Sequence, residues 1–281
     1  INNVGRGTDW LGLVTRNGSV NQHNISVNGG NVSTKYLVSG NYYQHKGVIK
    51  NSAIERFTFR TNIDQKISSY VNIGLNLTAS RINNDNSQLG GDAYENSGII
   101  RAALQQGPHI RAIDEDGYYP RNPQLSIQPN PYSLLTITDK GQIDRMLANT
   151  FIEINPIADL TIRFNTGFDR GITKRGNYLP KTTLHGELEN GKASIATTDK
   201  NDYLLELTAN YVKKINDVHQ LNLLAGTNRQ KTDVSTVSVG NTDFISDVFL
   251  WYNLNSGAGI KTVGSSRYEN TIASYFGRVN Y

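Results

Sequence analysis

Apolar and polar residues alternate along most of this chain. Between Val71 and Ala79 every second residue is apolar, and the residues between them are Asn, Gly and Thr. The stretches 160–169 and 203–211 show the same alternation, with Leu, Ile, Phe and Tyr opposite Thr, Arg, Asn and Glu. Because a β-strand directs successive side chains to opposite faces, this pattern predicts strands with one apolar and one polar face.

The pattern predicts nine strands, and their connections differ in length. The expected strands lie near 20–28, 34–45, 53–65, 70–82, 144–155, 159–171, 200–213, 219–230 and 269–281. Short connections fall at 29–31, 66–69, 155–158 and 215–217, a medium one lies around 46–48, and long segments cover 83–143, 172–199 and 231–268. Short turns on one side and long loops on the other are typical of an antiparallel transmembrane β-barrel.

Aromatic spacing supports the barrel over the alternative, a soluble antiparallel sandwich. Tyr203 and Tyr211 lie on the apolar side of one expected strand. At ~3.4 Å per residue and a tilt of ~40°, they stand about 21 Å apart along the membrane normal, which suits two aromatic girdles around an apolar band. The polar faces also consist of Asn, Thr, Ser and Gly rather than the Lys and Glu of a soluble surface.

Composition excludes several classes of protein. The 281 residues contain no Cys, which excludes a disulfide framework, a thiolate nucleophile and a Cys-ligated metal site. No apolar run approaches the ~20 residues of a transmembrane helix. A net charge of +4 is no argument for nucleic acid as a partner. The single Met is Met146 and no signal peptide precedes Ile1, so we expect a mature or truncated piece.

Candidate catalytic and metal-binding motifs are weak. The acidic turn at 114–117 lacks the spacing of a calcium loop, and a solvated turn is the favoured interpretation. The five His share no spacing that suits zinc. There is no G-x-S-x-G elbow and no phosphate-binding loop. The sequence therefore predicts no catalytic residue, no metal and no cofactor, and a membrane-embedded enzyme would need an acid–base cluster that we do not find.

Aromatic residues in the expected loops are the candidates for ligand contact. They are Trp10, Tyr94, Tyr118, Tyr119, Tyr132, Tyr178, Trp251 and Tyr252. Aromatic rings offer flat apolar faces to sugars and peptides, and Tyr adds a polar group; the alternative is that they pack the loops together. Residues 92–106 have helical spacing that ends before Gly107-Pro108. A long loop with its own helix is more often functional than idle.

A series of short motifs spreads over nearly the whole chain. They are Gly7-Thr8-Asp9-Trp10, residues 24–31 (NISVNGGN), 36–42 (YLVSGNY), 47–52 (GVIKNS), 60–64 (RTNID), 221–226 (LNLLAG) and 274–281 (SYFGRVNY). In this order and spacing they resemble the SusC-like TonB-dependent transporters of Bacteroidetes outer membranes, the RagA/SusC type. Each motif alone is weak, but the series is specific.

The resemblance implies a 22-stranded barrel with an N-terminal plug, of which this chain looks like strands two to ten. Residues 1–19 would be an extracellular loop segment and residues 20–281 a partial barrel domain, without the plug. The implied function is outer-membrane uptake of glycan oligomers, or secondly peptides, with no enzymatic step. The implied partners are a SusD-like surface lipoprotein, outer-membrane lipids, and TonB-ExbB-ExbD through the absent plug. No nucleic acid is expected.

The polar faces supply candidate residues of the barrel interior. We expect Asn72, Asn76, Arg163, Asp169, Glu206 and Asn210 to face the lumen, where they contact substrate or hydrogen-bond to the plug. The alternative function is a secreted or surface β-rich adhesin without transport, which should place Lys, Glu or Ser where this chain has Leu, Ile, Phe and Val. Nine strands leave two unpaired edges, so we expect an open, strongly curved sheet with long loops at one rim.

Overall fold

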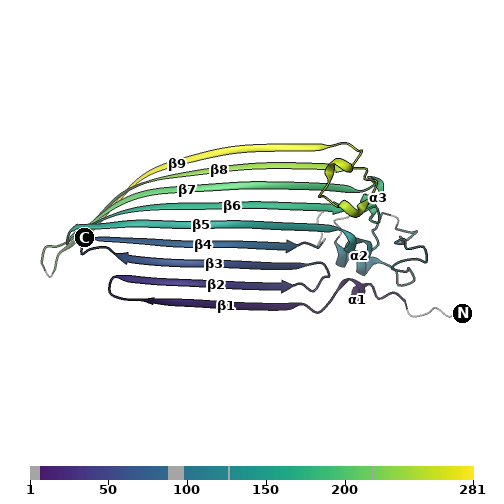
Figure 1. Ribbon diagram of the computed structural model, residues 1–281, viewed down its shortest axis with the longest axis horizontal. Coiled ribbons are helices and arrows are strands. Elements are labelled where there is room, and N and C mark those ends of the chain that lie inside the picture. The colour runs from purple at the N-terminus through teal and green to yellow at the C-terminus, as the bar shows by residue number, and fades with distance from the viewer. Residues whose placement is uncertain (1–6, 88–97, 126, 217) are drawn as a thin grey trace.

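A single antiparallel sheet dominates the computed structural model, which describes residues 7–87, 98–125, 127–216 and 218–281. Within these ranges nine strands lie in sequence order, as the alternation predicts (Figure 1). The strands are β1 (Ser19–Gly30), β2 (Thr34–Lys46), β3 (Ala53–Lys66), β4 (Val71–Asp85), β5 (Thr138–Ile157), β6 (Leu160–Leu179), β7 (Lys192–Lys214), β8 (Gln220–Thr242) and β9 (Thr262–Asn280).

The sheet is open. Among the described residues β1 pairs with β2 and β9 with β8, and these two edge strands do not pair with each other. Figure 1 shows the strands side by side, with the ends of β6–β9 bending over at the end where the turns are short. The predicted open and curved sheet is confirmed.

Strand register joins the alternating residues into two continuous faces. On the polar face, Asn76 of β4 lies directly between Asn62 of β3 and Asn149 of β5. One residue away, on the apolar face, Leu75 lies beside Ile63. Residues paired across an antiparallel ladder point to the same side of the sheet, so the pattern of one strand extends to the next.

All five strands in the second half of the chain, β5 to β9, are much longer than predicted. The expected loop at 172–199 shrinks to 180–191, and the expected loop at 231–268 shrinks to 243–261. The extensions are rich in Thr and Ser and have no continuous apolar face. The period-two signal therefore disappears there, although the backbone pairing continues. Polar side-chain contacts between neighbouring strands accompany this backbone pairing; for example, Thr198 Oγ1 lies 3.2 Å from Thr236 Oγ1.

Tyr178 illustrates the consequence for a single residue. The sequence places it in a loop, which is wrong: it lies near the end of β6, opposite Thr138 of β5 and Ala193 of β7. Its strand continues far past the apolar band, where no alternation marks it.

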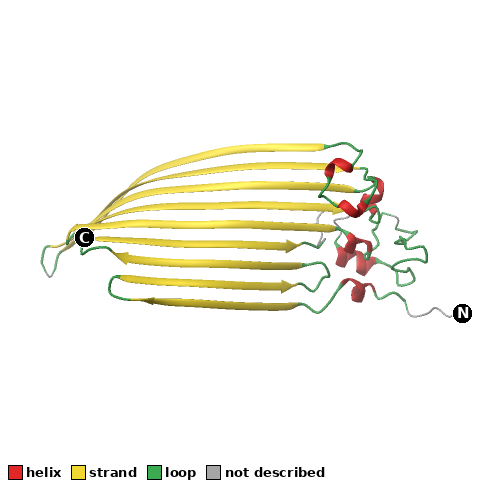
Figure 2. Cartoon of the chain, viewed as in Figure 1, coloured by secondary structure: helices red, strands yellow, loops and turns green. Residues whose placement is uncertain are grey.

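Helices and long connections gather at one end of the sheet (Figure 2). They are α1 (Trp10–Val14), α2 (Ile99–Gln105), α3 (Leu184–Leu188) and the short 3-10 turns η2 (Ser133–Thr136), η3 (Asp247–Phe249) and η4 (Leu254–Ser256). The helix expected at 92–106 is confirmed over α2, and its residues 92–97 lie outside the described residues. No described helix combines the length and apolar character needed to cross a bilayer.

The hydrophobic cores lie among the loops rather than under the sheet. One core packs Trp10 and Val14 of α1 against Ile99 and Ala102 of α2. Asp9 caps α1 by accepting a hydrogen bond from the Gly12 backbone N–H at 3.0 Å. The apolar face of the sheet is uncovered by any other layer of the described chain, as its many exposed Ile, Leu and Phe residues show.

Candidate functional site

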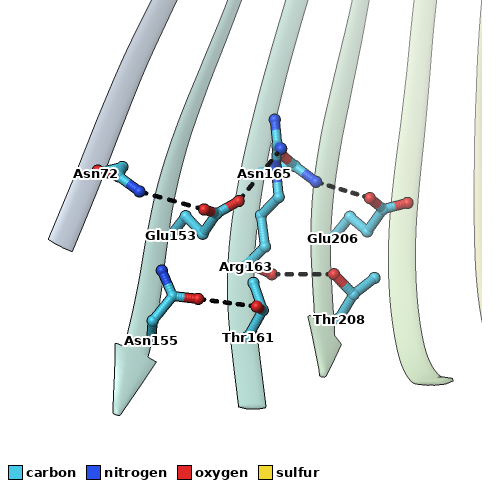
Figure 3. Close-up of polar contacts among 8 residues, drawn as sticks. All are labelled: Asn72, Glu153, Asn155, Thr161, Arg163, Asn165, Glu206 and Thr208. Atoms are coloured by element: carbon cyan, nitrogen blue, oxygen red, sulfur yellow. Dashed lines mark hydrogen bonds and ion pairs between the residues drawn. The ribbon is translucent and has the colours of Figure 1, made fainter. Parts of the chain in front are cut away.

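A hydrogen-bonded network crosses four strands on the polar face, near the short-turn end (Figure 3). Asn72 of β4 donates to the Glu153 carboxylate of β5 at 3.3 Å, and the other oxygen of Glu153 lies 3.6 Å from Arg163 Nη1 on β6. Arg163 Nε donates to Asn165 Oδ1 at 2.9 Å, and Asn165 Nδ2 donates to Glu206 of β7 at 2.8 Å. The network offers a band of donors and acceptors across the sheet.

Arg163 is held from several sides. Its guanidinium lies 4.0 Å from the centroid of the Phe151 ring, a cation–π contact. Phe151 in turn lies over Gly74 of β4, where an added Cβ would stand 2.1 Å from the ring. Glycine at this position therefore lets the ring approach the strand, and the ring supports the guanidinium.

Ion pairs continue along the same face toward the loops. Asp169 accepts two hydrogen bonds from Arg145, at 2.8 and 2.5 Å. Lys200 lies 3.0 Å from Asp202, and Arg175 forms a bidentate pair with Asp139, whose side chain is buried. These charges are thus matched in pairs, and their side chains, apart from that of Asp139, remain in reach of solvent. Such a surface can hydrogen-bond a polar solute or a second polypeptide.

The structure places all six residues predicted for the lumen on this one face. Asn72, Arg163 and Glu206 belong to the network, Asp169 pairs with Arg145, and Asn76 and Asn210 lie on the same side of their strands. That the face borders a lumen stays a prediction. Sequence reasoning missed Glu153 and Asn165, although their parity along the two strands could have identified them.

Three of the predicted loop aromatics are buried. Trp10 is 4% exposed, and its Nε1 donates to the Gly107 carbonyl at 3.1 Å. Tyr178 is fully buried against Phe244 and Trp251, with its hydroxyl donating to Asp247 at 2.6 Å. In this structure these rings pack the loops together, so their faces are not open to a ligand.

The other loop aromatics differ in exposure. Tyr118 and Tyr252 are 71% and 76% exposed. Tyr119 and Tyr132 are partly covered, with ring centroids 6.1 Å apart, and burial raises the pKa of the Tyr119 hydroxyl, helped by Tyr132. Tyr94 lies outside the described residues. The exposed rings are therefore the ones available to a partner or a cargo.

The acidic turn supports one of these exposed rings. Asp114 Oδ1 accepts from the backbone N–H groups of Asp116 and Tyr118, at 3.1 and 2.7 Å, and Gly117 has a φ of +86°. This is an Asx-type turn that uses the carboxylate internally. In the described part of the chain, no group of three or more His, Asp or Glu could hold a metal ion.

Comparison with known proteins gives the family. No family model matches the chain. TonB-dependent receptor P3 of Formosa agariphila is 31% identical over 279 residues, a match that covers 98% of this chain and 28% of that receptor. The chain belongs to the TonB-dependent receptors. A second receptor of the same organism, P26, is 26% identical over 97% of this chain. The chain thus spans under a third of the length of these curated relatives.

Solved structures agree on the fold. The RagAB peptide transporter superposes with a TM-score of 0.81 over 98% of this chain and 31% of that chain, at 22% identity. The ferric citrate transporter FecA gives 0.58 over 95% of this chain and 33% of that chain, at 13% identity. The resemblance to the SusC-like group is confirmed, and with it the outer-membrane location and the transmembrane barrel fold of this receptor segment.

Proposed function

We propose that this chain forms part of the barrel wall of a transporter that imports a polar oligomer across the outer membrane. The observation that carries the proposal is the opposite polarity of the two faces of the sheet. One is continuous and apolar across the strands, and the other bears a continuous network of amides and paired charges.

In this proposal the apolar face contacts lipid and the polar face lines the lumen. Paired but half-exposed charges such as Arg163 and Glu153 need water or polar groups around them, because burying them in hydrocarbon is costly. Amides of the Asn62–Asn76–Asn149 row both donate and accept, so they can exchange water for sugar hydroxyls or peptide groups. Weak contacts of this kind suit passage better than tight binding. The same groups also suit contact with a plug.

The proposed cargo is a glycan oligomer first and a peptide second. Exposed loop rings such as Tyr118 and Tyr252 favour either, because both cargos offer surfaces that stack on aromatic faces. A peptide gains support from the similarity in fold to RagAB, which is a peptide transporter. We further propose that a SusD-like lipoprotein covers the loop end and that TonB-ExbB-ExbD acts through a plug outside residues 1–281.

Complementation of a gene deletion tests this function. The full-length gene is deleted, and uptake of fluorescent oligosaccharides and of fluorescent peptides is measured with and without the wild-type gene in trans. We expect the deletion to abolish uptake of one cargo class and the wild-type gene to restore it. Unchanged uptake of both classes in the deletion strain contradicts the proposal.

The adhesin alternative fits the apolar face poorly. A secreted binding module has water on both faces of its sheet, whereas Phe57, Phe59 and Leu207 of this sheet are exposed on one side without a covering layer. No covalent chemistry is proposed, because the relatives are named as receptors.

A further inference from the structure

Two arginines on the polar face of β3 have no carboxylate partner. Arg56 and Arg60 lie on the same side of the strand as Asn62, and both residues are exposed. Within the described part of the chain, neither guanidinium forms an ion pair or a hydrogen bond. Glu55 precedes Arg56 but points to the opposite face, where it accepts a hydrogen bond from the Tyr42 hydroxyl at 2.9 Å. The two positive charges are therefore not neutralised by their neighbours.

The other charges on this part of the polar face already have partners. In the rows from Arg60 to Asp139, each described carboxylate lies beside a cation, and the pairs are Asp139–Arg175, Asp169–Arg145 and Asp202–Lys200. Asp64 lies four residues beyond Arg60, about 14 Å along the strand, which exceeds the screening length of ~8–10 Å at physiological ionic strength. This part of the face thus keeps the two positive charges of Arg56 and Arg60 in excess.

The neighbouring strands position these cations for a ligand. The Arg56 guanidinium lies 5.2 Å from the centroid of the Tyr43 ring on β2, a cation–π contact that leaves its N–H groups free. Arg145 lies two strands from β3, in the row of Thr58, which stands between the two unpaired arginines. Asp169 occupies two of the five N–H groups of Arg145, so three remain. Three guanidinium groups therefore surround one area of the polar face.

We propose that Arg56, Arg60 and Arg145 bind anionic groups of the cargo, so that the imported oligomer is acidic. A guanidinium binds a carboxylate through two parallel hydrogen bonds, which gives geometric selectivity as well as attraction. The Cα atoms of Arg56 and Arg60 lie about 14 Å apart along the strand, a spacing that suits successive charges of an oligomer better than one small anion. The inference rests on the proposed function, because it requires the polar face to line the path of the cargo.

Uptake by the deletion strain carrying the full-length gene tests the charge of the cargo. A carboxylate can come from an acidic peptide or from a uronic-acid glycan, so two fluorescent pairs are compared: oligoglutamate with oligoglutamine, and oligogalacturonate with its carboxyl-reduced form. We expect at least tenfold faster uptake of the acidic member of one pair, which identifies the source. Uptake without preference in either pair overturns the inference and leaves the proposed function standing. Uptake of neither pair overturns both.

Substitution of the unpaired arginines tests their role. The double variant Arg56→Gln/Arg60→Gln should lower uptake of the acidic oligomer at least tenfold and leave uptake of its neutral counterpart within twofold. The matched control Lys174→Gln/Arg229→Gln removes the same charge from the opposite face, where neither residue belongs to an ion pair of the described chain. It should change neither uptake. Unchanged acidic uptake in the first variant, equal loss in the control, or equal loss of the neutral oligomer overturns the proposal; the last result would assign the arginines to the plug or to barrel assembly.

Binding to the purified wild-type transporter keeps the test decisive if the first variant assembles poorly. Fluorescence anisotropy measures the affinity for the acidic oligomer and for its neutral counterpart as sodium chloride rises from about 50 mM to about 500 mM. Because salt screens exposed charges, we expect the acidic oligomer to bind at least tenfold more weakly at high salt and the neutral one to be unaffected. An affinity for the acidic oligomer that does not change with salt overturns the proposal.

Discussion

Glu153 and Arg163 face each other in direct register across β5 and β6, with a carboxylate oxygen 3.6 Å from the guanidinium. The pair stands at the centre of a network that reaches from β4 to β7. Both side chains keep part of their surface open, at 25% and 40% exposure, so solvent screens their attraction. The Glu153–Arg163 ion pair therefore serves to position polar groups more than to stabilise the sheet.

The substitution Glu153→Gln should consequently lower the stability of the protein only slightly. The amide oxygen can still accept from Asn72, and half-exposed ion pairs contribute less than about 1 kcal/mol. We expect the full-length variant to assemble normally and its unfolding free energy in urea to fall by less than that amount. Failure of the variant to reach the outer membrane would contradict this account of the pair.

Gly74→Ala tests the close approach of Phe151. The new Cβ would lie 2.1 Å from the ring, so the ring must move and the Arg163 contact with it. We expect a loss of about 1–3 kcal/mol in urea unfolding. Gly171→Ala is the matched control on the same face, because its Cβ would meet nothing within 4 Å. Equal stability of the two variants would show that the ring does not pack as described.

Substitution of two tyrosines at the loop end should distinguish a role in packing the loops from a role in binding cargo or a partner. Tyr178→Ala removes a buried ring and leaves Asp247 without its hydroxyl donor, so we expect about 3–5 kcal/mol lower stability of the loop end. Tyr118→Ala removes an exposed ring and should leave stability unchanged, while lowering cargo uptake or co-purification of the SusD-like lipoprotein severalfold. Limited proteolysis reports the first effect and pull-down the second. A loss of stability in Tyr118→Ala, with unchanged stability in Tyr178→Ala, would refute this assignment of roles.

The two faces of the sheet should differ in their tolerance to an introduced charge. Leu75→Arg places a cation on the apolar face, which costs about 2–4 kcal/mol near the bilayer midplane of a barrel. Asn76→Arg places the same side chain on the polar face between Asn62 and Asn149, where water or polar groups receive it. The heat-modifiable, folded fraction in outer membranes should fall for the first and not for the second. Comparable loss in both would argue against the assignment of faces.

The sequence predicted the sheet wherever one face is apolar. Strand count, order of short and long connections, and the faces of Leu75 and Asn76 all follow from alternation. The prediction failed where both faces are polar, so the extensions of β5 to β9 and the position of Tyr178 were missed. Backbone pairing continues there, but it leaves no pattern in side-chain polarity.

The candidate site was predicted in part for a similar reason. Parity along a strand assigned Arg163 and Glu206 to one face, but alternation does not give the register between strands. The Asn72–Glu153–Arg163 connection depends on that register and emerged only from the structure. Burial of Trp10 depends on packing between loops far apart in sequence, which the local pattern does not carry.

Spin-label accessibility measures the orientation of the two faces most directly. Residues 1–281 contain no Cys, so Leu75→Cys and Asn76→Cys introduce single labels into this stretch of the full-length protein, with any Cys outside it replaced. In outer-membrane vesicles, a label at position 75 should collide mainly with lipid-soluble oxygen. A label at position 76 should collide mainly with a water-soluble nickel chelate. Preference for the nickel chelate at position 75, or for oxygen at position 76, would contradict a barrel wall with a lipid-facing apolar side.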